Sequence, residues 1–202
     1  MKRTLIYSLA FLLGIFIFTQ CQPSAKEVDQ EIVEEKKAQD FGGYSTKEEL
    51  GEHLVGVAGC HDCHTPKKMG PNGPEFDLDR ALSGHPSDEP IPDLDRKGLE
   101  AKAIATNHGL TTWFGPWGVS FTANITSDPT GIGNWSLEQF TMAVRGGKSK
   151  GLATNRNLLP PMPLMKDLTD QEIEAIFAYL KSTKPINNVV PQALPPASAM
   201  PQ

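Results

Sequence analysis

A pair of cysteines followed by a histidine carries the clearest chemistry in this sequence. Residues 60–64 read CHDCH, so Cys60 and Cys63 are three residues apart and His64 follows directly. Residues i and i+3 lie on the same side of a helical turn, which brings both sulfurs to one face. This spacing is the attachment signature of c-type haem, which bonds to the two thiols while the histidine binds the iron. We therefore expect one covalently bound haem c, with His64 as an axial ligand.

Two other interpretations of the cysteine pair stay open on spacing alone. A disulfide or redox-active pair is expected within a thioredoxin-like βαβ pattern, and the sequence shows none. A zinc site needs further ligands, and no cysteine follows Cys63 in the chain. Covalent haem is the interpretation that the sequence favours.

A second iron ligand is expected on the side of the haem opposite His64. Met162 lies in the stretch LLPPMPLM, where the prolines stiffen the chain and reduce the entropy lost when a side chain is fixed. Met165, three residues further on, is the main rival. The weaker candidates lie close to the motif, within a predicted helix, in the tail or in loops where a lone histidine is usually a surface residue: Met69, Met142, Met200, His85 and His108.

Further contacts to the haem are expected from polar side chains and from one backbone group. Indole N–H groups and a guanidinium can pair with the propionates, and the candidates are Trp117, Trp135 and Arg145. A ligating histidine usually donates its other ring nitrogen to an orienting acceptor. For His64 we expect the backbone carbonyl of Pro71 or Pro74 in that role.

Helix signals predict the elements that position these residues. Capping residues and apolar spacing indicate helices at 46–58, at 97–106, from Ser136 to the Gly146-Gly147 pair, and from Thr169 to Pro185. No run of alternating apolar and polar residues indicates a strand. Residues 66–95 and 107–134 are predicted loops, and loops of that length in a compact domain are usually organised around something. We therefore predict an all-α domain with long loops around one covalently bound haem.

The N-terminal residues predict export and a lipid anchor. A basic start precedes an apolar run at 5–19, which is short for a membrane span and typical of an export signal. Cys21 follows at a position that resembles the lipobox of bacterial lipoproteins, and an uncleaved signal anchor is the alternative. The predicted organisation is a signal peptide at 1–20, a lipidated cysteine and tether at 21–43, a domain at 44–185 and a proline-rich tail at 186–202.

Composition excludes several classes of function. The formal net charge of −5 argues against a nucleic-acid partner, because phosphate binding relies on clustered Lys and Arg. The usual nucleotide-binding and hydrolase motifs do not occur in the sequence. The 17 prolines and 18 glycines predict much irregular structure.

Three stretches resemble bacterial single-haem c-type cytochrome domains: GEHLVGVAGCHDCHTP, ANITSDPTGIGNWSLEQFTMAVRGGKSKG and LPPMPLMKDLTDQEIEAIFAYLKSTKPINNVVP. The likeness is greatest to modules of the cytochrome subunits of membrane-bound dehydrogenases. It implies the all-α cytochrome c fold, in which Gly51 and Leu54 meet Phe177 or Tyr179 where the terminal helices cross. It also implies that the methionine of the P-P-M-P loop, here Met162, is the second iron ligand. Those subunits carry three such modules, whereas this chain has a single C-x-x-C-H motif.

The expected function is electron transfer and not catalysis. A histidine and a methionine leave the iron no position for oxygen or peroxide, and a thioether raises the reduction potential relative to two histidines. We expect a membrane-tethered lipoprotein on the periplasmic side that carries single electrons from a redox donor to an acceptor, alone or as a subunit of a dehydrogenase or oxidase complex. A haem-based sensor or a peroxidase-like haem enzyme is the alternative, and it would need a labile distal ligand.

Overall fold

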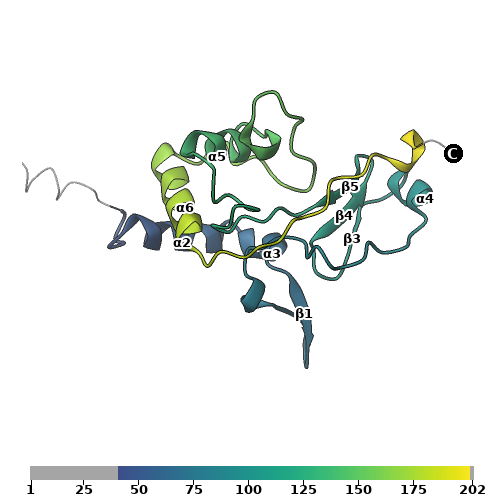
Figure 1. The fold of residues 1–202 in the computed structure, drawn as a ribbon, viewed down its shortest axis with the longest axis horizontal. Helices are drawn as coiled ribbons and strands as arrows, with labels where there is room; N and C mark the ends of the chain where they lie inside the picture. The colour runs from purple at the N-terminus through teal and green to yellow at the C-terminus, as the bar shows by residue number, and fades with distance from the viewer. Residues whose placement is uncertain (1–40, 201–202) are drawn as a thin grey trace, which may run out of the picture. The chain divides into compact units, whose positions relative to one another are not determined.

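The computed structural model describes residues 41–200, and Figure 1 shows the fold. The predicted signal peptide, Cys21 and the tether up to residue 40 lie outside the described residues. The helices of the described part are α2 (Lys47–Val57), α3 (Cys60–His64), α4 (Arg96–Glu100), α5 (Leu137–Val144) and α6 (Asp170–Ser182). Its strands are β1 (Lys67–Gly70), β2 (Gly73–Phe76), β3 (Ala105–Thr106), β4 (Thr112–Gly115) and β5 (Gly118–Phe121). Within residues 41–200, no helix has the length and apolar character needed to cross a bilayer.

The all-α prediction is wrong, because two small antiparallel sheets occupy stretches where the sequence predicts loops. Strands β1 and β2 form a hairpin, and β3, β4 and β5 form a three-stranded sheet in that order. The two hairpin turns share the sequence Gly-Pro-X-Gly, at residues 70–73 and 115–118. Proline presets the backbone for the turn, and Gly73 and Gly118 close it at positive φ. The domain is therefore a mixed α/β fold.

Helices α2 and α6 pack against each other at the centre of the core (Figure 1). Gly51 permits their close approach, because a Cβ there would overlap the backbone of Ala175 and lie 2.7 Å from Cβ of Tyr179. The structure thus confirms Gly51 at the predicted helix crossing. The buried side chains around this crossing form one apolar cluster: Val55, Leu82, Ile132, Phe140, Ile173, Ile176 and Leu180.

The predicted caps begin helices α2, α5 and α6. Thr46 accepts from the N–H of Glu49 at the start of α2. Full capping boxes begin the other two helices, as the sequence predicts: Ser136 with Gln139, and Thr169 with Glu172. Each box pairs N–H groups that a helix leaves unsatisfied in its first turn. Of the helix predicted at 97–106 only α4 forms, and the chain then enters β3.

Residues 185–199, which we call the C-terminal strap, run extended from the end of α6 to the region of β5 and α4 (yellow in Figure 1). The strap is attached at several points. The side chain of Asn188 is buried, Leu194 forms a β-bridge with β5, and the N–H of Ala197 donates to Glu100 of α4. These contacts make the strap part of the folded domain.

Candidate functional site

Helix α3 carries the C-x-x-C-H motif directly after α2. Ala58 caps α2, and Gly59 adopts a left-handed conformation with φ of 68° that turns the chain into α3. Glycine reaches this conformation without a steric cost. Both thiols are free and half-buried, and Cys60 packs against the apolar core. The two sulfurs are therefore presented from a single short turn that the core holds in place.

Burial keeps both thiols protonated. It raises the pKa of Cys60 to about 11 and also raises the pKa of Cys63 above its usual value. Cysteine binds metals as the thiolate. Moreover, residues 41–200 contain no group of three or more His, Cys, Asp or Glu side chains that could together bind a metal ion. The lack of such a group among these residues disfavours a zinc site at the cysteine pair.

The ring of His64 is oriented by one hydrogen bond. Its Nδ1 donates to the backbone carbonyl of Ala123 at 2.7 Å. A carbonyl can only accept, so Nδ1 carries the proton and Nε2 keeps its lone pair. Burial lowers the pKa of the ring, which favours this neutral form. A metal-ligating histidine is usually held in the same way, with its second nitrogen bound to a carbonyl or carboxylate.

The acceptor for His64 differs from the one that the sequence suggests. Pro71 and Pro74 belong to the β1–β2 hairpin, which projects away from α3 in Figure 1. Ala123 lies 59 residues beyond His64, just after β5, and no sequence signal relates the two positions. The prediction of a backbone carbonyl as the acceptor is confirmed. The prediction that Pro71 or Pro74 supplies this carbonyl is wrong.

The loop that carries Met162 is attached at one end to the turn after α5 and at the other to the last residue of α5. At one end the N–H of Leu158 donates to the carbonyl of Gly147 at 2.7 Å. At the other end the N–H of Met165 donates to the carbonyl of Val144 at 2.9 Å. Met162 lies between these anchors, where its side chain is half-buried.

Ser120 attaches the middle of the same loop to β5. Its Oγ donates to the carbonyl of Pro160 at 2.6 Å and accepts from the indole N–H of Trp117 at 3.1 Å. Three residues further along the chain, Ala123 supplies the carbonyl that orients His64. One short stretch of chain therefore fixes both the histidine and the methionine loop, and neither of its contact residues is singled out by the sequence.

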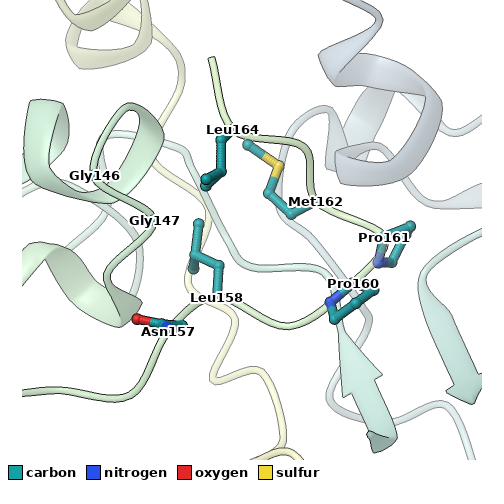
Figure 2. Close-up of a pocket in the computed structure, with 8 residues that line it drawn as sticks. All are labelled: Gly146, Gly147, Asn157, Leu158, Pro160, Pro161, Met162 and Leu164. Atoms are coloured by element: carbon teal, nitrogen blue, oxygen red, sulfur yellow. The ribbon is translucent and has the colours of Figure 1, made fainter. Parts of the chain in front are cut away.

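Met162 also lines a cavity of about 340 Å³. Figure 2 shows its side chain near Leu164 and next to the two prolines that precede it. Gly147 also lines the cavity, beside Leu158 and Leu164. Met165 is not among the lining residues, and its N–H donates to the carbonyl of Val144 at the end of α5. The surroundings therefore favour Met162 over Met165 as a ligand.

The other candidate ligands lie in different surroundings. His85 is fully buried, its Nδ1 is 3.0 Å from the hydroxyls of Thr111 and Thr112, and its ring packs on Phe121 at 5.0 Å. Burial lowers the pKa of His85, and its Nε2 has no partner in the described part of the chain. His108 is exposed in the turn before β4. The weaker methionine candidates lie in β1, in α5 and at the end of the described chain: Met69, Met142 and Met200.

The three predicted propionate partners differ in what they contact. The indole N–H of Trp117 is committed to Ser120. Trp135 packs against the apolar core. Arg145 donates to Asp170 at 2.8 Å and to a backbone carbonyl just before α6 at 2.6 Å, which joins the end of α5 to the start of α6. Propionate contacts from these residues stay a prediction, and Trp135 is the candidate with no competing polar contact shown.

Comparison with known proteins gives relatives over part of the chain. It is 32% identical to the cytochrome c subunit of alcohol dehydrogenase (quinone) from Gluconobacter oxydans, over 67% of this chain and 21% of the relative. It is also 32% identical to the fructose dehydrogenase cytochrome subunit of Gluconobacter japonicus, over 47% of this chain and 19% of the relative. The chain is a relative of dehydrogenase cytochrome subunits. This confirms the resemblance seen in the sequence.

Other comparisons limit what the relatives imply. The chain is 38% identical to a subunit of nicotinate dehydrogenase from Pseudomonas putida, over 38% of this chain and 6% of the relative. No family model matches the chain. The chain spans about a fifth of the length of each of these two cytochrome relatives. It therefore corresponds to a part of those proteins.

The residues around α3 fit a haem c. Two thiols lie on one short helix, and the histidine after them is neutral with a free lone pair on Nε2. Met162 offers a thioether at the edge of a cavity, and its loop is attached to the same stretch of chain as His64. This donor set of two thiols, an imidazole and a thioether is that of a c-type cytochrome.

Proposed function

We propose that this protein is a c-type cytochrome that carries single electrons through one haem, bound covalently to Cys60 and Cys63 and ligated by His64 and Met162. The observation that carries the proposal is the geometry of α3. Two free thiols share one short helix, and the histidine after them is oriented by the carbonyl of Ala123. The relatives support it independently, because two of them are cytochrome subunits.

The residues of the chain would hold and tune the cofactor. When bound, haem supplies a ferric–ferrous couple that accepts and releases one electron. The carbonyl of Ala123 makes the imidazole of His64 a stronger donor. The attachments of the Met162 loop to α5 and β5 limit the freedom of the thioether, so that little entropy is lost when the sulfur binds. A thioether opposite a histidine favours the reduced state more than a second histidine does.

With His64 and Met162 both bound to it, the iron would have no open position at which oxygen, peroxide or an organic substrate could react, which suits electron transfer and not catalysis. Two relatives are named as cytochrome subunits of dehydrogenases. By the same reasoning the electron donor of this protein is a dehydrogenase, and a second redox protein accepts the electron.

The place of the carrier follows from the N-terminal sequence. Lipidation of Cys21 would tether the domain to a membrane on the periplasmic side, and the polar residues after it would let the domain move between its partners. Cell fractionation tests this. Cys21→Ser should release the protein from the membrane fraction or block its processing, and unchanged membrane association with an intact N-terminus would instead indicate a signal anchor.

Covalent attachment is tested on a denaturing gel. Haem bound through thioethers stays with the polypeptide, so the wild-type band should stain for haem peroxidase activity. A Cys60→Ala, Cys63→Ala double variant should lose the stain. An unstained wild-type band would refute the haem proposal.

The spectrum of the purified protein tests the ligation. A low-spin spectrum in both redox states, with the long-wavelength band of an iron–methionine bond in the ferric form, supports the carrier. A high-spin ferric spectrum, or binding of carbon monoxide by the wild-type ferrous protein, would favour a haem-based sensor or a peroxidase-like enzyme with a labile distal ligand.

A further inference from the structure

Asn188 in the C-terminal strap binds the loop at 82–87 from inside the domain. Its Nδ2 donates to the carbonyl of Ser83 at 2.7 Å and to that of His85 at 2.8 Å. Its Oδ1 accepts from the N–H of Ser87 at 2.9 Å. The residue is 8% exposed, so water cannot easily replace these bonds. The strap therefore fixes this loop through one amide side chain.

The loop that Asn188 holds is bound directly to the motif helix. Gly84 lies between the two carbonyls that Asn188 binds, and its N–H donates to the carbonyl of His64 at 2.8 Å. Gly84 also packs on Ala123, because a Cβ at Gly84 would be 2.5 Å from the Ala123 backbone. Its φ of 77° is a second reason why glycine occupies this position.

The same loop pairs with the chain on both sides of Ala123. The N–H of His85 donates to the carbonyl of Thr122 at 3.0 Å, and the N–H of Ile125 donates to the carbonyl of Leu82 at 2.9 Å. Ala123 sits between these two bonds, and its own carbonyl accepts from the ring of the motif histidine. The position of that carbonyl thus depends on the position of the loop.

A second set of contacts joins the strap to the residue after Ala123. The hydroxyl of Thr130 accepts from the N–H of Asn188 and from Nδ2 of Asn124, both at 3.0 Å. Nδ2 of Asn124 also donates to the carbonyl of Ile186 in the strap at 2.8 Å. The strap therefore reaches the acceptor of the histidine by two routes, through the 82–87 loop and through Asn124, which binds the strap both directly and by way of Thr130.

We propose that Asn188 is a positioning residue for His64: the strap holds the Ala123 carbonyl at hydrogen-bonding distance from Nδ1 and thereby sets the strength of the axial ligand. This inference rests on the proposed haem ligation by His64. Loss of the Asn188 contacts loosens the loop and weakens the Nδ1–H···O bond. A weaker bond makes the imidazole a poorer donor, which stabilises the ferric state less, so the reduction potential rises.

The test is a redox titration of the purified holoprotein. Asn188→Ala should shift the midpoint potential upward, on the order of a threefold change in the ferric-to-ferrous equilibrium, or about 30 mV at 59 mV per tenfold change for one electron. Thr130→Val removes the Thr130 bonds to Asn188 and Asn124 but leaves Asn124 bound to Ile186, so it should shift the potential in the same direction by a smaller amount. It serves as the test if Asn188→Ala does not fold.

Two controls separate positioning from general loosening. Gln192→Ala removes an exposed amide from the same strap and should leave the potential unchanged. Ile173→Val destabilises the core in α6 and should lower the thermal midpoint without moving the potential. The inference is overturned if Asn188→Ala and Thr130→Val leave the potential unchanged, or if Ile173→Val shifts it equally. Absence of haem from the wild-type protein would instead refute the proposed function.

Discussion

Replacing Ser120 with alanine tests whether β5 holds the Met162 loop in place. Ser120 is 8% exposed, and its Oγ joins two groups that are far apart in the chain. It donates to the carbonyl of Pro160 at 2.6 Å and accepts from the indole N–H of Trp117 at 3.1 Å. Alanine removes both bonds and detaches the loop from the strand, while the attachments of the loop to α5 stay in place.

The size of the effect follows from the two lost bonds. Both partners are partly exposed and can turn to water, so the net value of about 0.5–1.5 kcal/mol per hydrogen bond applies, or about 1–3 kcal/mol in total. The bond to Trp117 lies within the β4–β5 hairpin, so its loss affects the open and closed states of the loop alike. Only the bond to Pro160, worth about 0.5–1.5 kcal/mol, restrains the loop, and its loss makes dissociation of Met162 from the iron roughly 2- to 12-fold more favourable. Any share lost from global stability reduces that factor.

Binding of carbon monoxide to the ferrous protein reports the open state of the loop. Ser120→Ala should bind it faster than wild type by about the factor derived above, and Ser120→Thr, which keeps the hydroxyl, should behave as wild type. Ser182→Ala is the matched control, because its hydroxyl also donates to a backbone carbonyl, but at the end of α6. Equal rates for wild type and Ser120→Ala, with unfolding in urea shifted by the full amount, would refute the idea that this bond restrains Met162.

Three further predictions test the choice of iron ligand, the helix crossing and the loss of stability at acid pH. Met162→Ala should give a high-spin ferric spectrum and newly acquired cyanide binding, whereas Met165→Ala should keep the low-spin spectrum and cost about 1–3 kcal/mol of stability; the reverse pattern would make Met165 the ligand. Gly51→Ala should lower the free energy of unfolding in urea by about 3 kcal/mol or more, because the new methyl group meets the backbone of α6 and not a flexible side chain, and a loss below about 1 kcal/mol would contradict that contact. The hydrogen bond from Arg80 lowers the pKa of Asp77 in the folded protein. The ionised carboxylate therefore stabilises the fold at a pH above its unfolded pKa of about 3.9. This contribution is lost as the pH falls through the pKa of the folded state. Asp77→Asn should therefore lower stability by at most about 1 kcal/mol at pH 7, since Arg80 is partly exposed, and by nothing measurable at the acid end; an equal loss at both pH values would exclude the ion pair as its cause.

The sheets were beyond prediction from hydrophobic patterning because their strands are too short to show it. No strand among residues 41–200 exceeds four residues, and the pattern of burial along β1 and β2 does not alternate. A different signal was present. The tetrapeptides GPNG at 70–73 and GPWG at 115–118 both form two-residue hairpin turns, and prolines and glycines that predict loops also predict such turns.

The helices could be predicted because their signals are local. Capping residues and the apolar spacing that follows them lie within one or two turns of each other, and α2, α5 and α6 begin where those signals place them. The exception is the helix predicted at 97–106. There Asp95 caps the short helix α4, which ends at Glu100. The side chain of Glu100 is buried and accepts a hydrogen bond from Ala197 of the strap.

The sequence by itself determined the chemistry of the site, because the thiols and the imidazole lie within five consecutive residues and one turn of helix is enough to align them. It also narrowed the second ligand to Met162 or Met165, through the prolines around them. Only the tertiary structure decided the acceptor of His64, which is 59 residues away. The proposal of Met162 over Met165 rests on the bonds from β5 and from the end of α5 to its loop. Backbone carbonyls and serine hydroxyls occur throughout any chain, so their identity carries no information about which of them the fold will bring to the ligand.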